Sequence, residues 1–221
     1  MLIPVPWRLL EPPPDPPPLQ EPLLIALDVR DPLPDPVRAA LAASLAPAEQ
    51  QRWEALRLPE DRERFLRGRG ALRRLLGAWR DEPPEAVPIG AGAHGKPCCT
   101  GGPEFNLSHS GDLILLALHR QRPVGVDVEQ LRPGLAWRPI ARRVLPPAEW
   151  QALEAEGAEA FLAAWCRLEA RLKAQGLGLA GLDNHRQGPS ADDAGLHLWD
   201  VAVPAGYQAA VALAGVSLSQ R

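Results

Sequence analysis

Two carboxylates stand two positions apart in the run VGVDVE at residues 124–129. On a β-strand the side chains alternate, so the three valines face one way while Asp127 and Glu129 both face the other. Two carboxylates on one face repel each other unless a cation lies between them, and their oxygens are ligands suited to Mg²⁺. The polar face of a solvent-exposed edge strand has the same pattern, so the run predicts either a metal site or an exposed edge.

A second pair of ionisable residues, Glu169 and Lys173, lies four positions apart between residues 159 and 175. This segment has apolar residues at helical spacing, which predicts a helix with a buried stripe. The stripe consists of Phe161, Trp165, Leu168 and Leu172. A carboxylate at the edge of such a packed face needs a partner. The alternative is a surface ion pair that contributes a few tenths of a kcal/mol, about 0.2–0.5.

Three further residues could bind an anion. Ser108 and His109, in the motif FNLSHSG at residues 105–111, offer hydrogen-bond donors in what the Asn, Ser and Gly content predicts to be a turn. Neighbours on an extended chain point apart, so the two do not form a Ser–His catalytic pair. Lys96, between Gly95 and Pro97, would present a point charge of the kind that binds phosphate. A solvated lysine and a structural histidine are the alternatives.

Residues 52–80 carry nine arginines and few acids. They are Arg52, Arg57, Arg62, Arg64, Arg67, Arg69, Arg73, Arg74 and Arg80. A solvated, arginine-rich helix explains them equally well, but beside a phosphate-rich ligand they would form a binding surface.

Composition excludes several classes of protein. With 221 residues, 46% of them hydrophobic, the chain can bury one sizeable core or two small ones. The net charge of −3 argues against nucleic acid as the partner, although an arginine-rich nucleic-acid-binding module is the rival class to consider. Three cysteines form neither a disulfide framework nor a metal-ligand spacing, and no segment resembles a signal peptide or a membrane span. We therefore expect a cytoplasmic protein without a membrane partner.

The chain repeats one pattern at a separation of about 100 residues, which predicts an internal duplication. The paired segments are 23–32 and 124–133, 45–49 and 145–149, the helical stretches that open at Phe65 and Phe161, and the apolar runs 113–119 and 207–214. We expect an α/β (α+β) fold in which two similar α/β subdomains, residues 21–122 and 123–221, are related by a pseudo-twofold axis, with the active site in the cleft between them. Residues 1–20, rich in proline, are expected to form a disordered, solvated leader.

These motifs occur together in an order and spacing that resemble the surfactin-synthetase-type 4′-phosphopantetheinyl transferases. The resemblance rests on FNLSHSG at 105–111, VGVDVE at 124–129 and WCRLEARLKAQGLGL at 165–179, with Glu169 lying 42 residues after Asp127. GKP at 95–97 and DRERFLRGRGALRRLL at 61–76 are also similar to the family. The resemblance implies an enzyme that transfers the phosphopantetheine arm of coenzyme A to a serine of an apo acyl or peptidyl carrier protein and releases adenosine 3′,5′-bisphosphate. It also implies that the enzyme is a monomer.

The resemblance also implies roles for individual residues. Asp127, Glu129 and Glu169 match the acidic residues that hold Mg²⁺, or Mn²⁺ in its place. Lys173 matches the lysine at the leaving phosphate, and Glu169 matches the base for the serine hydroxyl. The residues that match the coenzyme A contacts of the family are Arg52, Arg64, Lys96, Ser108 and His109.

Two positions depart from the family pattern. Leu168 replaces a lysine that usually precedes the helix glutamate, and Glu49 stands where many relatives have a basic residue. Arg167 or Arg171 could supply the missing charge, or the enzyme could be slower. The departures leave open the alternative that the protein is a non-catalytic homologue, which binds coenzyme A or a carrier protein.

Overall fold

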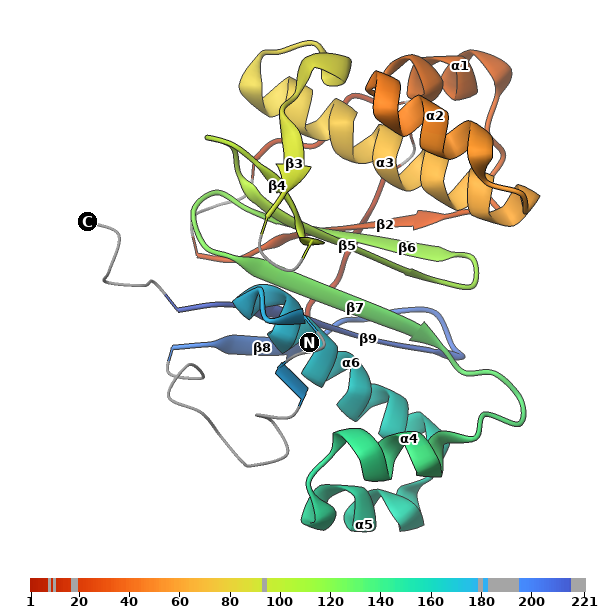
Figure 1. The fold of residues 1–221 in the computed structure, drawn as a ribbon, viewed down its shortest axis with the longest axis vertical. Helices are drawn as coiled ribbons and strands as arrows, with labels where there is room; N and C mark the ends of the chain where they lie inside the picture. The colour runs from red at the N-terminus through yellow and green to blue at the C-terminus, as the bar shows by residue number, and fades with distance from the viewer. Residues whose placement is uncertain are drawn as a thin grey trace.

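A computed structural model describes residues 1–7, 9, 11–16, 20–92, 95–178, 181–182 and 195–215. The first half of the chain builds a four-stranded sheet of order β1-β2-β6-β5 with helices on one face (Figure 1). Its strands are β1 (Val5–Pro6), β2 (Leu23–Asp28), β5 (Glu104–Ser110) and β6 (Leu113–His119), and its helices are α1 (Asp35–Ala43), α2 (Pro47–Ala55) and α3 (Pro59–Arg80). A short 3₁₀ helix, η1 (Pro84–Ala86), and a two-stranded sheet, β3 (Ile89–Ala91) and β4 (Pro97–Cys99), follow α3.

The second half repeats the order of a strand, three helices and an antiparallel strand. Its three-stranded sheet has the order β7-β9-β8. Its elements are β7 (Val124–Gln130), α4 (Trp137–Val144), α5 (Pro147–Glu156), α6 (Ala158–Gln175), β8 (His197–Asp200) and β9 (Tyr207–Leu213). The mixed α/β fold is therefore confirmed, whereas the pseudo-twofold relation and the boundary at residue 122 stay predictions.

The four-stranded and the three-stranded sheets face each other, and the helices cover their outer faces (Figure 1). Alternate residues of β2 and β6 pack with the three valines of β7 in one apolar cluster between the sheets, as the strand period requires. The opposite face of the first sheet packs on α1 and α3, and the apolar stripe of α6 packs on α4 and α5. Among the described residues, no helix is both long and apolar enough to cross a membrane.

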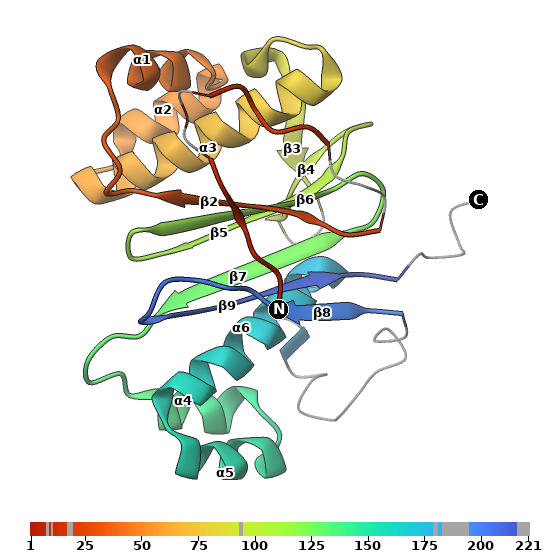
Figure 2. The ribbon, with the colours of Figure 1, turned by 180° about the vertical axis from the view of Figure 1, so that it is seen from behind.

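The leader differs from the solvated extension that its prolines predict. Val5 and Pro6 pair in parallel with β2, and Leu2 forms a parallel bridge with Val201 in the second half. Figure 2 shows this dark red segment running across both sheets. The side chain of Trp7 is 6% exposed. Proline has no N–H, but an edge strand forms hydrogen bonds on one side only and therefore tolerates it. The prolines of the leader thus do not prevent its pairing with β2.

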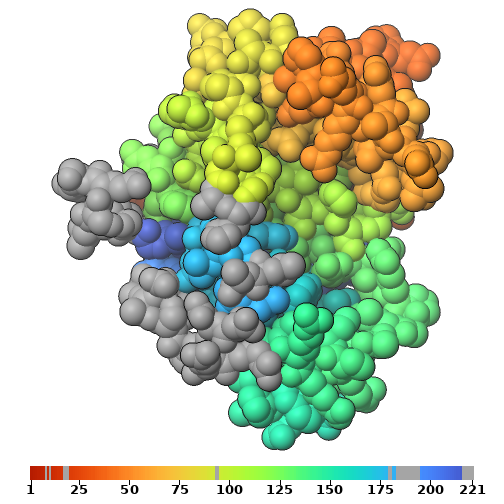
Figure 3. Space-filling model, viewed as in Figure 1, coloured from red at the N-terminus to blue at the C-terminus, as the bar shows by residue number. Residues whose placement is uncertain are grey.

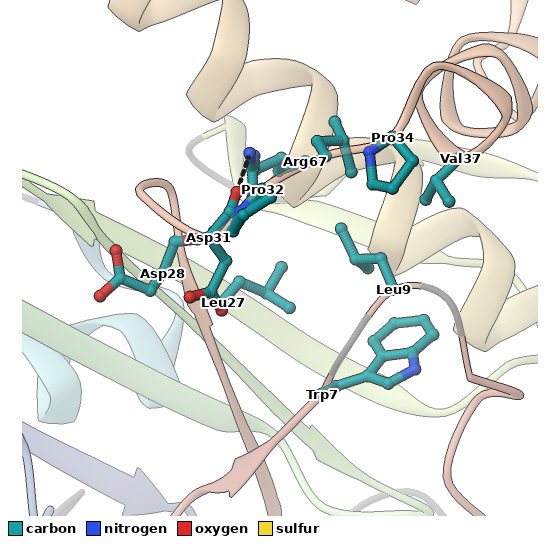
Figure 4. A pocket seen from close by; sticks show the side chains of 10 residues that line it. Trp7, Leu9, Leu27, Asp28, Asp31, Pro32, Pro34, Val37 and Arg67 are labelled. Atoms are coloured by element: carbon teal, nitrogen blue, oxygen red, sulfur yellow. Dashed lines mark hydrogen bonds between the residues drawn. The ribbon is translucent and has the colours of Figure 1, made fainter.

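Trp7 and Leu9 also line a pocket on the first half (Figure 4). They face Leu27 of β2 and Val37 of α1 around it, and Arg67 of α3 closes one side by donating from Nη2 to the Asp31 carbonyl at 2.7 Å. The start of the chain is thus part of the first hydrophobic core.

Replacing Trp7 by alanine should lower the free energy of unfolding by about 3–5 kcal/mol, because it removes a large buried side chain. Urea denaturation followed by circular dichroism measures the change. Ile3→Ala is the matched control, since the Ile3 side chain is 79% exposed and its loss should cost less than about 0.5 kcal/mol. Equal stabilities of the two variants would mean that the leader does not belong to the core.

Candidate active site

Asp127 and Glu129 lie side by side on β7, facing away from the three valines as the alternation predicts. Asp127 is 4% exposed and Glu129 is half-buried, so this is not the polar face of an exposed edge. A buried carboxylate needs hydrogen bonds or an opposite charge. The structure supplies both to Asp127: the first half of the chain donates a hydrogen bond and the second half places a positive charge beside it.

The first half contributes through β5, which runs beside β7. Three of its side chains accept hydrogen bonds from main-chain N–H groups of β7: Asn106 from Val126 at 2.9 Å, Ser108 from Val128 at 3.4 Å and Ser110 from Gln130 at 3.1 Å. The two serine hydroxyls in turn donate to the carboxylates of Asp127 and Glu129, each at 2.9 Å. The polar side chains thus replace a missing strand partner along the edge of β7.

These contacts correct the predicted turn at residues 105–111. The segment is a strand up to Ser110, and the turn is confined to Gly111 and Asp112. Its Asn and Ser residues are buried because they pair with β7, so their polarity does not indicate a loop.

The second half contributes Lys173 of α6. Its Nζ donates to Asp127 Oδ1 at 2.5 Å and to the Val126 carbonyl at 3.3 Å. The sequence predicted the Glu169–Lys173 pair on one helix face, but the lysine turns to the strand carboxylate. Glu169 is half-buried on the same helix, one turn before Lys173.

The electrostatics of the three carboxyl groups favour a bound cation. Burial raises the pKa of Glu129, although the Ser110 hydroxyl opposes the shift, and burial also raises the pKa of Glu169 against the charge of Lys173. The negative charges of neighbouring carboxylates raise the pKa of both glutamates further. The Asp127 carboxylate has a buried oxygen, Oδ2, for which no hydrogen-bond partner is found in the described part of the chain.

A buried, unpartnered carboxylate oxygen is rare in proteins and calls for an unseen partner such as an ion. The chemistry of these side chains suits a divalent cation, because Mg²⁺ is held by one or two carboxylates together with substrate oxygens. Among the described residues, however, no group of three or more His, Cys, Asp or Glu side chains is arranged to hold a metal ion. The set of Asp127, Glu129 and Glu169 as metal ligands therefore stays a prediction. In the structure the cation that bonds to Asp127 is the ammonium group of Lys173.

Beside this site lies a pocket of about 340 Å³ between α2, α3 and β5. Figure 3 shows the orange surface of the helices α2 and α3 above the green surface of the strands, on the side of the molecule viewed in Figure 1. Three of the predicted anion-binding residues line the pocket together: Arg52, Arg64 and His109. Arg64 donates to the Gly111 carbonyl at 3.2 Å and to Asp61 at 2.5 Å, which fixes its guanidinium at the rim.

The surroundings of His109 favour the uncharged form of its ring. Burial, together with the positive charge of Arg64, lowers its pKa below the ordinary value near 6.5. The charge of Lys173 lowers it further, so the pocket and the carboxylate site lie within electrostatic reach of each other.

Arg69 lines the same pocket and was not singled out from the sequence. Its Nη1 is buried and no partner for it is found among the described residues, while its Nε lies 3.5 Å from Glu49. Glu49 also pairs with Arg73. Glu49, which departs from the family pattern, therefore pairs with two arginines, Arg69 and Arg73. Within a run of nine arginines, only the fold distinguishes the one with a free, buried nitrogen.

The structure does not bring Ser108 and Lys96 into this pocket. The Ser108 hydroxyl points to β7, on the opposite side of β5 from His109, and is used twice there. Lys96 Nζ donates to the carbonyls of Val124 and Lys173 at 2.9 and 2.8 Å, so it joins the two halves. Their predicted role as coenzyme A contacts stays a prediction.

Leu168 lies where the stripe predicts, 4% exposed in the core formed with α4 and α5. Arg167 forms an exposed, two-bond ion pair with Asp200, each bond 2.7 Å long, and so turns away from the carboxylate site. Of the two residues expected to compensate for Leu168, Arg167 thus has another partner.

Comparison with known proteins supports the interpretation of this site. Residues 123–204 match the model of the family described as the 4′-phosphopantetheinyl transferase superfamily. The chain is 37% identical over 152 residues to the 4′-phosphopantetheinyl transferase HetI of Nostoc sp., which covers 65% of this chain and 64% of the relative. It is 41% identical over 121 residues to the 4′-phosphopantetheinyl transferase AcpT of Salmonella typhi, which covers 52% and 59%.

The chain thus spans less than two thirds of the length of these relatives. The finer assignment to the surfactin-synthetase type stays a prediction. The matched segment includes Asp127 and Glu129 on β7 and Glu169 and Lys173 on α6. Residues 123–204, which carry the carboxylate site, thus match the model of the 4′-phosphopantetheinyl transferase superfamily, and the assignment of the whole chain to this family is a proposal.

Proposed function

We propose that this protein transfers the 4′-phosphopantetheine group of coenzyme A to a serine of an acyl or peptidyl carrier protein, in a reaction that needs Mg²⁺ or Mn²⁺. The observation that carries the proposal is the buried Asp127, which pairs with Lys173 and has an oxygen, Oδ2, without a hydrogen-bond partner among the described residues. Its negative charge also raises the pKa of two further carboxyl groups, Glu129 and Glu169. The names of the relatives and the adjacent arginine pocket support it.

In the proposed reaction the carrier serine oxygen forms a bond to the β-phosphorus of coenzyme A, and the bond from that phosphorus to the bridging pyrophosphate oxygen breaks. The carrier gains the phosphopantetheine arm, and adenosine 3′,5′-bisphosphate leaves. When bound, the divalent cation would neutralise charge on the pyrophosphate. The chain's own contribution is to position the reactants and to stabilise charge.

Glu169 is the proposed base that takes the serine proton, directly or through water. Burial raises its pKa toward neutrality, which suits a group that must both accept and release a proton near pH 7. Lys173 would follow the leaving phosphate oxygen, because its ammonium lies at Asp127, one of the proposed metal ligands. The positive charge balances negative charge as the bond breaks.

Coenzyme A would be held through its phosphates by Arg52, Arg64, Arg69 and His109, which line one pocket. Phe65 and Leu107 give the same pocket an apolar wall, and Arg52 stacks over the Phe65 ring at 5.5 Å. Guanidinium groups that are already oriented by other contacts lose little freedom when they bind phosphate. We expect binding by this protein as a monomer in the cytoplasm.

The direct test incubates the protein with coenzyme A, Mg²⁺ and several apo carrier domains. We expect one carrier to gain the mass of a single phosphopantetheine arm, and the gain to disappear when EDTA removes the metal. Absence of transfer to every carrier, with coenzyme A still bound tightly, would favour the rival proposal of a non-catalytic binding homologue.

Glu169→Gln should lower kcat by about 10²–10⁴-fold, since the amide keeps the shape of the side chain but cannot accept the proton. Stopped transfer assays with the same carrier measure the loss. Glu159→Gln, an exposed change on the same helix, should leave kcat unchanged. Normal turnover by the Glu169 variant would remove this residue from the mechanism.

Arg69→Gln should weaken coenzyme A binding by about 10- to 100-fold, the effect of losing one charge-assisted hydrogen bond of about 1.5–3 kcal/mol. Glu49 keeps its pair with Arg73 in this variant, so no buried charge is left alone. Isothermal titration calorimetry gives the affinity, and the exposed Arg57→Gln is the control. If both variants bind equally well, the buried nitrogen of Arg69 is not a ligand contact.

Coenzyme A should bind more tightly as the pH falls below neutrality. The pKa of His109 is lowered in the free protein, and a phosphate beside the ring would raise it, so binding takes up a proton. Affinity is then highest below the lower pKa of the free protein and is lost as the pH rises through the raised pKa of the complex. Titrations between about pH 5.5 and about pH 8 should show this slope, beyond that of the ligand's own phosphates.

His109→Gln is the control that isolates the ring. It leaves the titration of the ligand unchanged and should flatten the additional slope. An identical pH dependence of the two proteins would show that His109 does not face the phosphate.

A further inference from the structure

Gly125 lies on β7 directly against α6, at a point where no side chain fits. A Cβ placed on Gly125 would lie 2.1 Å from the Ala170 carbonyl oxygen, 2.4 Å from the Ala174 nitrogen and 2.8 Å from Lys173 Cβ. Two of these atoms belong to the main chain of the helix and cannot rotate away. Gly125 is not among the glycines with positive φ, so the close approach of the helix, and not the backbone conformation, requires glycine here.

The rest of the contact between α6 and the sheet is also made by small residues. Cys166, Ala170 and Ala174 follow each other at four-residue intervals on one face of α6. They pack against Ala210 and Ala212 of β9, and all five are at most 2% exposed. We call this contact, together with Gly125, the small-residue seam. Its side chains are too short to act as spacers, so the helix lies close to the sheet.

The depth of α6 on the sheet determines where its charged residues reach. Lys173 is next to Ala174, and its Nζ bonds to Val126 and Asp127, the two residues that follow Gly125 on β7. The first half holds the same turn of the helix, because Lys96 donates to the Lys173 carbonyl at 2.8 Å. Moving α6 outward would therefore withdraw both Lys173 and Glu169 from the strand carboxylates.

We propose that Gly125 is a positioning residue of the active site, which sets the separation between Glu169 and Lys173 on α6 and Asp127 and Glu129 on β7. It acts through main-chain contact alone and touches no substrate. The kinetic part of this inference rests on the proposed transferase function, whereas the effect on metal binding does not.

Gly125→Ala tests the inference, with Gly90→Ala as matched control because a Cβ at Gly90 meets no atom within 4 Å. We expect kcat for transfer to fall by about 100-fold, the usual effect of a displacement of about 1 Å among catalytic groups. The KM for coenzyme A should change less than about threefold, because the arginine pocket belongs to α2, α3 and β5. A purely structural defect would lower the amount of folded enzyme without this separation of kcat from KM.

Titration with Mn²⁺ alone, followed by electron paramagnetic resonance, gives a readout without turnover. Affinity for Mn²⁺ should fall by about 10- to 100-fold in Gly125→Ala, as for other changes that displace metal-holding carboxylates. If the wild type binds Mn²⁺ but modifies no carrier, the proposed function fails while this comparison still tests the seam. If the wild type neither binds Mn²⁺ nor transfers, Gly125 positions no site and the inference fails too.

A second pair of variants covers the case that Gly125→Ala does not fold. Ala210→Val enlarges the seam from β9, and the adjacent Ala209→Val enlarges the opposite face of the same strand. We expect the Ala210 variant to lose kcat and Mn²⁺ affinity and the Ala209 variant to retain both. Wild-type kcat and Mn²⁺ affinity in Gly125→Ala or, where that does not fold, in Ala210→Val would overturn the inference.

Discussion

The burial of the Asp127 carboxylate is the constraint from which the other features of this structure follow. A charged group that is almost fully buried costs several kcal/mol, on the order of the entire stability of a domain, unless hydrogen bonds and an opposite charge compensate it. Oδ1 accepts from Ser108 in the first half and from Lys173 in the second. Oδ1 of Asp127 is therefore fully bonded only when the two halves are assembled, so the same interactions stabilise the fold and build the site.

The edge of β7 also joins the two halves of the chain. Its N–H groups would be unpaired beside the first sheet, because β5 is not bonded to β7 as a ladder partner. Side chains of β5 accept these hydrogen bonds, and the serines among them pass their own hydrogens to the carboxylates. One motif thereby closes the sheet edge and orients the acidic residues. Polar residues that look like a turn in the sequence are in fact the inner lining of an interface.

Local periodicity predicted the elements that carry the site, and tertiary contacts decided the rest. The alternation around Asp127 and the apolar stripe beside Glu169 specify a strand and a helix, because each pattern reflects burial of one face. The partner of Lys173, the buried nitrogen of Arg69 and the inward turn of Ser108 depend on contacts between residues far apart in the chain. No sequence period encodes such contacts. The leader was mispredicted because proline content reports on backbone freedom and not on the burial of Trp7.

The leucine at position 168 follows from the packing around it. Its side chain lies in the core between α6, α4 and α5, so a lysine there would have to bury its charge or displace the stripe. Arg167 does not replace the missing charge, since its guanidinium is committed to Asp200 at the surface. Among the described residues, the cation bonded to the buried carboxylate is Lys173, and it reaches Asp127 because α6 lies so close to Gly125. The packing of small residues thus brings Lys173 within bonding distance of Asp127, where its charge compensates that of the buried carboxylate.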